Sequence, residues 1–387
     1  MKTITQQNST RVTGLVCTAC GKQYDMHAIQ GFATCCNQPL SAQYNLSYLD
    51  KYELKDGPLS MWRYAALLPM FDEKNIVSLG EGFTPIHTLH KLSAKLSIKN
   101  IYLKDESVNP TGSFKARGIS AAISKAKELG IQHCIIPTAG NAGGALSAYC
   151  AKADIKATVI MPTHTADTLK DECSLYGAEL ILVNGLIDAC GRLAKQMAQE
   201  QKAFDMSTMK EPYRLEGKKT IGYEIAEQLN WQLPDVIIYP TGGGTGLIGM
   251  WKAFKDMLEL GWITRKLPRM VVVQTDNCNP MIQLFNNNII NETFEAKPTL
   301  AYGLAVPSPF AKDLIMQVLH ESNGFAIAVS EEEMERGIAE IAMSEGLLLS
   351  PEGSATFMGL RKLIEKDWLK EDENVLIFNT GSWYKYR

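Results

Sequence analysis

The sequence predicts an α/β fold built from two doubly wound parallel-sheet domains, in which ligands bind beyond the carboxyl ends of the strands. Short apolar runs rich in β-branched residues alternate with segments of helical periodicity over most of the chain. In the segment 118–130, Ile119, Ala122 and Ile123 recur at helical spacing. Continuous apolar strands separated by helices are typical of parallel sheets buried on both faces. The predicted strands are 134–137, 157–162, 178–183, 236–240, 271–274 and 374–378.

Composition narrows the class of protein. The 387 residues include 39 basic and 42 acidic side chains, and 45% are hydrophobic, which is typical of a soluble globular protein. The chain has no long basic run and no apolar stretch of about 18 residues, so we expect neither a nucleic-acid partner nor a membrane span. The start MKTITQQNSTR has no apolar core of a signal peptide. These features predict a soluble cytoplasmic protein.

The organisation of the chain changes along its length, and four segments are expected. An N-terminal ribbon-like segment carries a cluster of cysteines, an arm then crosses into the core, and a smaller and a larger α/β domain follow. The predicted bounds are 1–45 for the ribbon, 46–110 for the arm, 111–220 for the smaller domain and 221–387 for the larger domain.

The loop 105–118 places a lysine where a helix begins. Lys115 follows the turn residues Gly112 and Ser113, and the amphipathic helix starts directly after it. The positive end of the helix dipole disfavours a cation there and lowers the pKa of the amine. Such a lysine suits attack on a carbonyl group. The alternative is a solvated surface lysine.

Two further loops follow predicted strands. In 137–153, Asn141 can donate its amide to a ligand oxygen or cap the helix that follows, and the residues leave both readings open. In 240–249, three consecutive glycines before a helix favour binding of an anionic phosphate by backbone N–H groups. The loop has neither the Walker lysine nor the G-x-G-x-x-G pattern. Thr380 ends the last predicted strand in an equivalent position.

Together, these four pieces resemble the fold-type II pyridoxal-phosphate enzymes of the tryptophan-synthase-β class, over roughly residues 76–387. The resemblance implies a cleft between the two domains that holds pyridoxal 5′-phosphate as cofactor, with Lys115 as its attachment point and catalytic base. It implies that Asn141 faces the phenolic oxygen of the cofactor and that Thr380 faces the pyridine nitrogen. The residues implied to hold the phosphate are Gly242, Gly243, Gly244, Thr245 and Gly246.

Within this class the sequence is most similar to the threonine synthase family. The similar stretches are EGFTPIHTL at 81–89, NPTGSFK at 109–115 and YRLEGKKTIGYEI at 213–225. The family converts O-phosphohomoserine and water into threonine and phosphate, and a homodimer is expected by analogy. Ala116 and the triple glycine instead follow a dehydratase-like pattern. A serine/threonine dehydratase, a β-replacement enzyme and a non-catalytic binding protein of the same fold therefore stay as alternatives.

The family reaction needs groups that bind the substrate carboxylate and the departing phosphate. The resemblance implies that Thr138 belongs to the carboxylate loop, and Ser113 is expected beside it. Arg214 and Lys218, four residues apart, rank first among the candidate phosphate donors. The other candidates are Lys104, Arg117 and Lys170.

The N-terminal cysteines form half of a good zinc motif. Cys17 and Cys20 are a C-x-x-C pair followed by Gly21, which is typical of a zinc knuckle. In the second half, Cys36 stands where the last ligand is expected, whereas Ala33 occupies the partner position and Cys35 is out of register. Zinc bound by Cys17, Cys20 and Cys36, with His27 as a possible fourth ligand, and a vestigial ribbon with free thiols both stay open.

Overall fold

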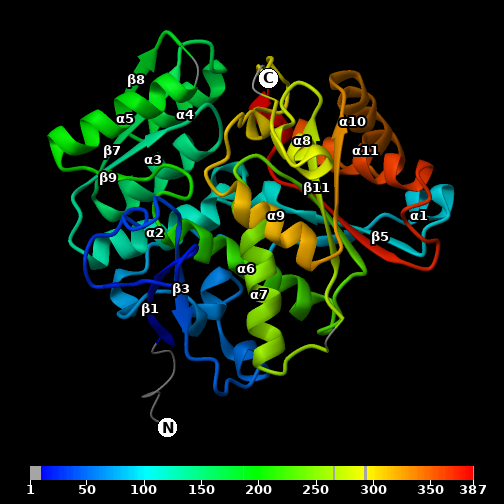
Figure 1. The fold of residues 1–387 in the computed structure, drawn as a ribbon, viewed down its shortest axis with the longest axis horizontal. Helices are drawn as coiled ribbons and strands as arrows, with labels where there is room; N and C mark the ends of the chain where they lie inside the picture. The colour runs from blue at the N-terminus through cyan, green and yellow to red at the C-terminus, as the bar shows by residue number, and fades with distance from the viewer. Residues whose placement is uncertain (1–9, 186, 265, 292–293, 387) are drawn as a thin grey trace.

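The computed structural model describes residues 10–185, 187–264, 266–291 and 294–386. The first nine residues of the predicted ribbon and Arg387 lie outside this description. A four-stranded sheet and a six-stranded sheet lie on opposite sides of the molecule, and a small ribbon lies beneath the first (Figure 1). The structure confirms the α/β class with parallel sheets.

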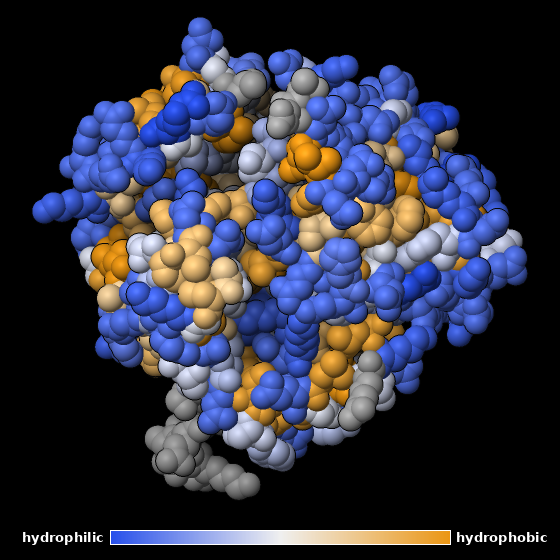
Figure 2. All heavy atoms as spheres, in the orientation of Figure 1, coloured by the Kyte–Doolittle hydropathy of each residue, from blue (hydrophilic) through white to orange (hydrophobic). Residues whose placement is uncertain are grey.

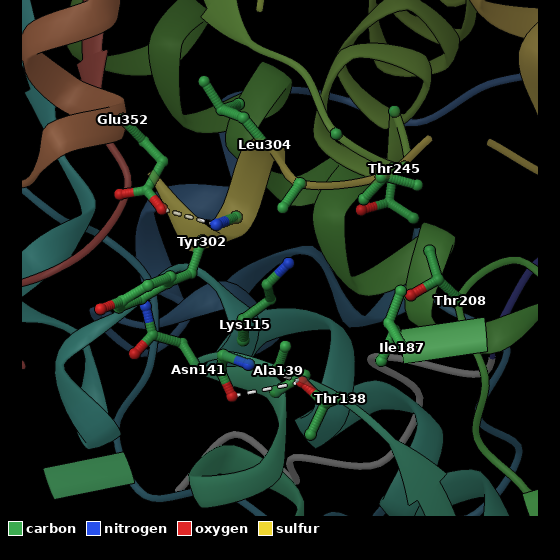
Figure 3. Close-up of a pocket in the computed structure, with 18 of the residues that line it drawn as sticks. Lys115, Thr138, Ala139, Asn141, Ile187, Thr208, Thr245, Tyr302, Leu304 and Glu352 are labelled. Atoms are coloured by element: carbon green, nitrogen blue, oxygen red, sulfur yellow. Dashed lines mark hydrogen bonds between the residues drawn. The ribbon is translucent and has the colours of Figure 1, made fainter. Parts of the chain in front are cut away.

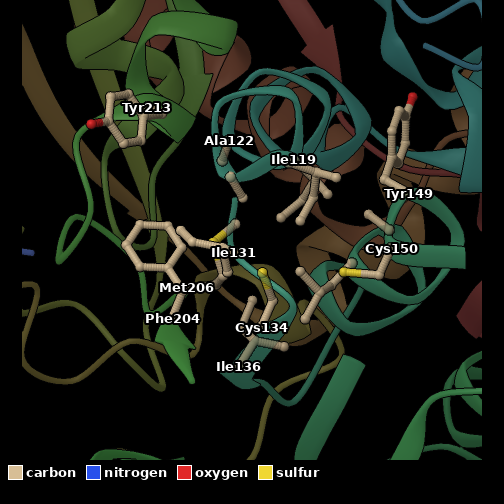
Figure 4. Packing of buried hydrophobic residues seen from close by; sticks show 14 of the residues in the cluster. Ile119, Ala122, Ile131, Cys134, Ile136, Tyr149, Cys150, Phe204, Met206 and Tyr213 are labelled. Atoms are coloured by element: carbon tan, nitrogen blue, oxygen red, sulfur yellow. The ribbon is translucent and has the colours of Figure 1, made fainter. Parts of the chain in front are cut away.

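The smaller sheet has the strand order β8-β7-β6-β9, and all of its paired strands are parallel. Its strands are β6 (His133–Pro137), β7 (Lys156–Pro162), β8 (Glu179–Val183) and β9 (Phe204–Asp205). Its helices are α2 (Lys115–Glu128), α3 (Ala142–Ala153), α4 (Asp167–Leu175) and α5 (Ile187–Gln201). Cys134 and Cys150 pack in the core of this unit beside Ile119 and Ile136 (Figure 4), so these thiols act as small apolar side chains.

The larger sheet has the strand order β12-β11-β10-β13-β5-β4. Its strands are β4 (Ile86–Thr88), β5 (Asn100–Asp105), β10 (Val236–Pro240), β11 (Arg269–Thr275), β12 (Phe325–Val329) and β13 (Asn374–Asn379). The short edge strand β4 is antiparallel to β5, which departs from the purely parallel sheet expected. The carboxyl ends of the central strands β10 and β13 meet at one edge, where doubly wound sheets bind ligands.

The remaining helices cover the larger sheet or lie between the two sheets. These are α1 (His90–Leu96), α6 (Tyr213–Gln228), α7 (Thr245–Glu259), α8 (Pro280–Asn287), α9 (Lys312–Glu321), α10 (Glu331–Glu345) and α11 (Pro351–Glu365). Short 3₁₀ helices are Glu53–Asp56, Met61–Leu67, Glu73–Asn75, Glu106–Val108, Pro110–Gly112, Tyr302–Leu304 and Trp383–Tyr386. No helix in these described ranges has the length and apolar composition needed to cross a membrane. On the face shown in Figure 2, hydrophilic side chains predominate and hydrophobic ones form separate groups.

The N-terminal ribbon is a three-stranded antiparallel sheet of order β2-β1-β3. Its strands are β1 (Val12–Cys17), β2 (Gln23–Tyr24) and β3 (Leu40–Tyr44). Leu15 and Leu40 are buried in the same apolar cluster as the helices of the smaller unit. Tyr44 on β3 donates a hydrogen bond to Glu216 on α6 at 2.8 Å. The ribbon is therefore packed onto the body of the protein.

All six predicted strands are confirmed, as β6, β7, β8, β10, β11 and β13. Among the strands that the sequence analysis missed, β5 carries Lys104, which interrupts its apolar pattern although the side chain is fully buried. Strand β9 has only two residues, too few for a periodicity. The five dispersed cysteines are all buried, as expected for thiols that pack as apolar groups. The domain boundaries themselves stay a prediction.

A buried ion-pair network joins β5, α2 and α6 behind the sheet edge. Arg117 donates to both carboxylate oxygens of Glu106, at 2.6 and 2.7 Å, and also pairs with Glu224. Lys104 donates to Glu224 at 3.0 Å, so two cations face two anions. All four side chains are fully buried. Although burial opposes ionisation, the charge of Arg117 holds the pKa of Glu106 at about 2.

Arg117→Met is expected to lower the free energy of unfolding by about 3–5 kcal/mol, because Glu106 and Glu224 would stay buried without a counter-charge. Urea unfolding at neutral pH measures this loss. Arg192→Met is the control, since Arg192 pairs with Asp188 while 72% of its side chain is exposed, and a change within about 0.5 kcal/mol is expected there. Equal losses in the two variants would contradict the prediction.

Candidate active site

A cavity of about 330 Å³ lies where the loops after β6, β10 and β13 and the loop before α2 converge. The cavity is lined by residues at the ends of strands from both sheets and by residues of the segment 302–310. Figure 3 shows Lys115 pointing into the space between the 138–141 loop and Tyr302 and Leu304. Sequence-predicted residues that line this cavity are Lys115, Thr138, Asn141, Gly242, Gly243, Gly244, Thr245, Gly246 and Thr380. The structure therefore brings together all four pieces that the sequence singled out.

The position of Lys115 depends on pairing between two distant segments. The Phe114 N–H donates to the Thr380 carbonyl at 3.0 Å, and the Ser382 N–H donates to the Gly112 carbonyl at 2.8 Å. This pairing joins the loop before α2 to the end of β13. As a result, Lys115, the first residue of α2, lies in the same cavity as Thr380.

The amine of Lys115 is shifted toward its neutral form. Burial of the amine, followed by the charge of nearby Arg214, lowers its pKa to about 8, and Glu352 opposes the shift. The sequence argument attributed this effect to the helix dipole, whereas the structure provides desolvation and a neighbouring cation as causes. A lysine in this state is a competent nucleophile and proton acceptor near neutral pH.

The structure favours ligand binding over capping for Asn141. Asn141 precedes α3, but its side chain makes no capping hydrogen bond within the described part of the chain. Instead, its amide nitrogen donates to the Tyr386 hydroxyl at 3.3 Å. Its carbonyl oxygen is buried and has no hydrogen-bond partner among the described residues. The side chain thus offers hydrogen-bonding capacity to a group in the cavity.

The glycine loop between β10 and α7 is held close to its surroundings. Gly244 has φ of +77°, a conformation that glycine adopts without strain. A Cβ atom at Gly242 would lie 2.2 Å from the Gly303 carbonyl oxygen. Among the described residues, no group accepts a hydrogen bond from the N–H groups of Gly242, Gly243 and Gly244. Free N–H groups at the start of α7 form a site suited to an anion.

Three of the four predicted substrate residues lie outside the cavity lining. Ser113, Arg214 and Lys218 are buried behind it, and only Thr138 contributes to the lining. Arg214 donates to the Met206 carbonyl at 2.6 Å, and Lys218 donates to the carbonyl of Phe114. In this structure both cations therefore bind the backbone of segments that border the cavity.

The buried carboxylate of Glu211 adjoins Arg214. One oxygen accepts the N–H groups of Tyr213 and Arg214 at 2.7 and 2.9 Å. The other oxygen has no hydrogen-bond partner among the described residues and lies 3.9 Å from Nε of Arg214. Burial raises the pKa of Glu211 to about 7, against the lowering effect of Arg214. The carboxyl group is therefore partly protonated near neutral pH.

Lys210, Tyr302 and Tyr386 line the cavity but were not assigned to the site from the sequence. Lys210 lines the cavity, whereas Arg214 and Lys218 do not. It therefore provides a basic side chain within the cavity. Tyr302 stacks on Tyr386, with ring centroids 5.6 Å apart. Glu352, by contrast, is a residue that the family resemblance already places near the cofactor ring; it accepts the Gly303 N–H at 2.7 Å, and burial raises its pKa. Lys210 follows an ordinary polar turn in the sequence, and Tyr386 lies in a segment that carries no strand or helix signal.

The predicted metal ligands lie apart from this cavity, in the N-terminal ribbon. The sulfur atoms of Cys17, Cys20 and Cys36 gather at one point. The sulfur of Cys35, expected to be out of register, joins them, with all four within 4.8 Å of one another. His27 instead stacks on Phe71, with ring centroids 4.8 Å apart.

Comparison with known proteins fits this geometry. Residues 77–381 match the family described as pyridoxal-phosphate dependent enzyme. A threonine synthase from Methanocaldococcus jannaschii is 34% identical over 95% of this chain and 92% of its own length. The chain belongs to the threonine synthase family of pyridoxal-phosphate-dependent enzymes. A threonine synthase from Methanosarcina acetivorans is 33% identical over 96% of this chain and 92% of its own length.

Solved structures of similar fold support the architecture of this threonine synthase family member. Threonine deaminase isoform 2 from Solanum lycopersicum superposes with a TM-score of 0.66 at 21% identity, covering 88% of this chain and 93% of the deaminase. Maize serine racemase gives a TM-score of 0.67 at 20% identity, covering 77% of this chain and 87% of the racemase. These similarities establish the fold, and the threonine synthase relatives establish the family.

Glu211→Gln is expected to reduce the pH dependence of stability. The pKa of Glu211 rises from its ordinary 4.5 to about 7 on folding, so its stabilising contribution is complete below pH 4.5 and is lost as the pH rises through 7. Glutamine retains an acceptor for the two N–H groups. The free energy of unfolding is measured by urea unfolding at pH 5 and at pH 8. From pH 5 to pH 8, that of the parent protein should fall by about 2–3 kcal/mol more than that of the variant. Parallel pH profiles would show that Glu211 titrates normally.

Proposed function

We propose that this protein is a pyridoxal-phosphate-dependent threonine synthase that converts O-phosphohomoserine and water into threonine and phosphate. The observation that carries the proposal is one cavity lined by Lys115, Asn141, the glycine loop 242–246 and Thr380. The named relatives cover almost the whole chain and support the substrate. We further propose that it acts in the cytoplasm as a homodimer, by analogy with the family.

The residues present fit the cofactor. Lys115, with its lowered pKa, would carry the cofactor covalently, and Asn141 has an unpartnered buried oxygen in the same cavity. The free N–H groups of 242–244 and the start of α7, including Thr245 and Gly246, suit its phosphate group. Thr380 would face the ring nitrogen with a hydroxyl, which supplies no full positive charge there. The bound cofactor supplies an electron sink that weakens the Cα–H bond of an attached amino acid.

Lys115 has the properties of the base that moves protons at the substrate. Its amine points into the cavity, and its pKa of about 8 leaves about a tenth of the amine neutral at pH 7. A base with a pKa close to the working pH can both accept and return a proton. Residues of the segment 302–310 line the same cavity as this amine.

The two ends of the substrate would be bound by different parts of the cavity. Thr138 accepts the Gly140 N–H at 3.1 Å and so orders the loop whose hydroxyl and N–H groups suit the substrate carboxylate. Lys210 is the cation available for the departing phosphate, because Arg214 and Lys218 are committed to backbone carbonyls. The predicted roles of Arg214 and Lys218 are therefore better read as positioning of the cavity walls.

A second candidate function is serine/threonine dehydration, favoured by the dehydratase-like Ala116 and triple glycine. Ala116 is fully buried and does not line the cavity among the described residues. The assay that separates the two functions supplies O-phosphohomoserine, threonine and serine to purified protein with pyridoxal phosphate. Phosphate release with threonine formation supports threonine synthase, whereas 2-oxoacid release from threonine or serine supports dehydration.

Lys115→Ala is expected to reduce threonine formation by about 10²–10⁴-fold, because the cavity loses its base. The visible absorbance band of cofactor joined to a protein amine should disappear as well. Lys127→Ala is the matched control, since Lys127 lies on the same helix but is exposed, and its activity and absorbance should equal those of the parent. A retained band in Lys115→Ala would exclude this lysine as the attachment point.

Gly243→Val is expected to weaken cofactor binding by about tenfold or more, a loss of about 1.4 kcal/mol. A Cβ atom at this position would lie 2.8 Å from Cγ2 of Thr208, so the loop must shift away from the anion that it would hold. Equilibrium dialysis against pyridoxal phosphate measures the change. Gly14→Ala, whose Cβ meets only the end of the flexible Gln23 side chain at 3.3 Å, should bind the cofactor normally.

A further inference from the structure

The N-terminal ribbon contains two turns of the same kind. In the first, the Cys17 N–H donates to the Lys22 carbonyl at 2.9 Å, and Gly21 has φ of +74°. In the second, the Ala33 N–H donates to the Gln38 carbonyl at 2.8 Å, and Asn37 has φ of +51°. Each turn joins two residues that are five positions apart and has a residue of left-handed conformation directly after a cysteine. The second turn thus has the backbone of a metal-binding knuckle, with Ala33 at the position equivalent to Cys17.

The four sulfur atoms of the ribbon have the spacing of a tetrahedral thiolate site. Those of Cys17, Cys20, Cys35 and Cys36 all lie within 4.8 Å of one another, and the sulfurs of Cys20 and Cys35 are 3.5 Å apart. Four sulfurs bound to one zinc at about 2.3 Å would be about 3.8 Å apart. The cluster therefore needs only small side-chain adjustments to enclose an ion.

We propose that these four cysteines bind one structural zinc ion, and that Cys35 supplies the ligand that the Ala33 position lacks. The adjacent residues Cys35 and Cys36 then serve as the second ligand pair in place of a second C-x-x-C. Four thiolates fill the coordination sphere of zinc and leave no open position for a substrate, which is the arrangement of a structural site. The proposal does not depend on the proposed enzymatic function.

The segment between β1 and β3 has few buried apolar side chains, so an ion would be needed to stabilise it. Of its residues, Met26 and Ala33 are buried apolar side chains, whereas Cys20 and Cys35 are exposed. A segment with so small a core gains little from burial, and a metal that closes its two turns stabilises it instead. Phe32 in this segment packs edge-on against Phe310, a residue of the cavity wall, with ring centroids 6.1 Å apart. The ion would thereby fix a segment that supports the active-site cavity.

The decisive measurement is the zinc content of the purified full-length protein by inductively coupled plasma mass spectrometry. One zinc per chain is expected in the parent and in Thr34→Ala, which changes an exposed side chain of the same turn. Cys35→Ser should fall well below one zinc per chain and should melt at a lower temperature. Full zinc content in Cys35→Ser, or a parent protein that contains iron or no metal, would overturn the proposal.

A relocation experiment tests the equivalence of the two turns. The double variant Ala33→Cys, Cys35→Ser restores the C-x-x-C spacing and should regain zinc that Cys35→Ser lacks. A double variant that folds, as judged by circular dichroism, but stays free of zinc would contradict the equivalence.

A thiol count separates a metal site from a disulfide between Cys20 and Cys35. After denaturation in the presence of a chelator, all nine cysteines should react with a thiol reagent if the site held zinc. Two fewer reactive thiols would show a disulfide and would overturn the proposal.

Discussion

The orientation of the first turn of α2 is the constraint on which the active site depends. Arg117 lies two residues after Lys115 and is fully buried between Glu106 and Glu224. Because the guanidinium group is planar and pairs with both carboxylates, it fixes the rotation of the helix about its axis. With the helix in this orientation, Lys115 points into the cavity (Figure 3). The network does not touch the cavity, yet it determines where the reactive amine lies.

A second constraint joins the end of the chain to this helix. The backbone pairing of 112–114 with 380–382 places Thr380 beside Lys115. Lys385 extends the connection, because it pairs with Glu172 on α4 at 2.6 Å and with the carbonyl of Thr111 at 2.8 Å. One C-terminal segment therefore contacts both the smaller unit and the loop that carries the lysine. The cavity keeps its shape because its walls are tied together by a segment from the far end of the sequence.

The sequence was sufficient for features that depend on local chemistry. Buried parallel strands show as apolar runs, and the loops after them show as glycine, threonine and asparagine. Strands β6, β10 and β13 were therefore predicted correctly, and the loops after them line the cavity. Features that depend on distant partners were not accessible in this way. The choice between ligand binding and capping for Asn141 depends on Tyr386, 245 residues away. The place of Cys35 depends on how the turn at Ala33 folds back over Cys17 and Cys20.

Residues 213–225, the stretch that most resembles the family, contain the two basic residues predicted to bind the substrate phosphate. Their charge alone did not indicate that they lie outside the cavity lining. This stretch forms α6, in which every residue from Tyr213 to Ala226 is buried. Several of its charges are paired inside the protein, as in the pairing of Lys219 with Glu216 at 3.0 Å, whereas Lys218 donates to a backbone carbonyl. A helix buried on all sides between two sheets restricts every one of its positions, so its sequence reflects packing and ion pairing. Lys210, which lines the cavity, lies on the loop that precedes this helix, so a cavity-lining basic residue comes from outside the stretch that most resembles the family.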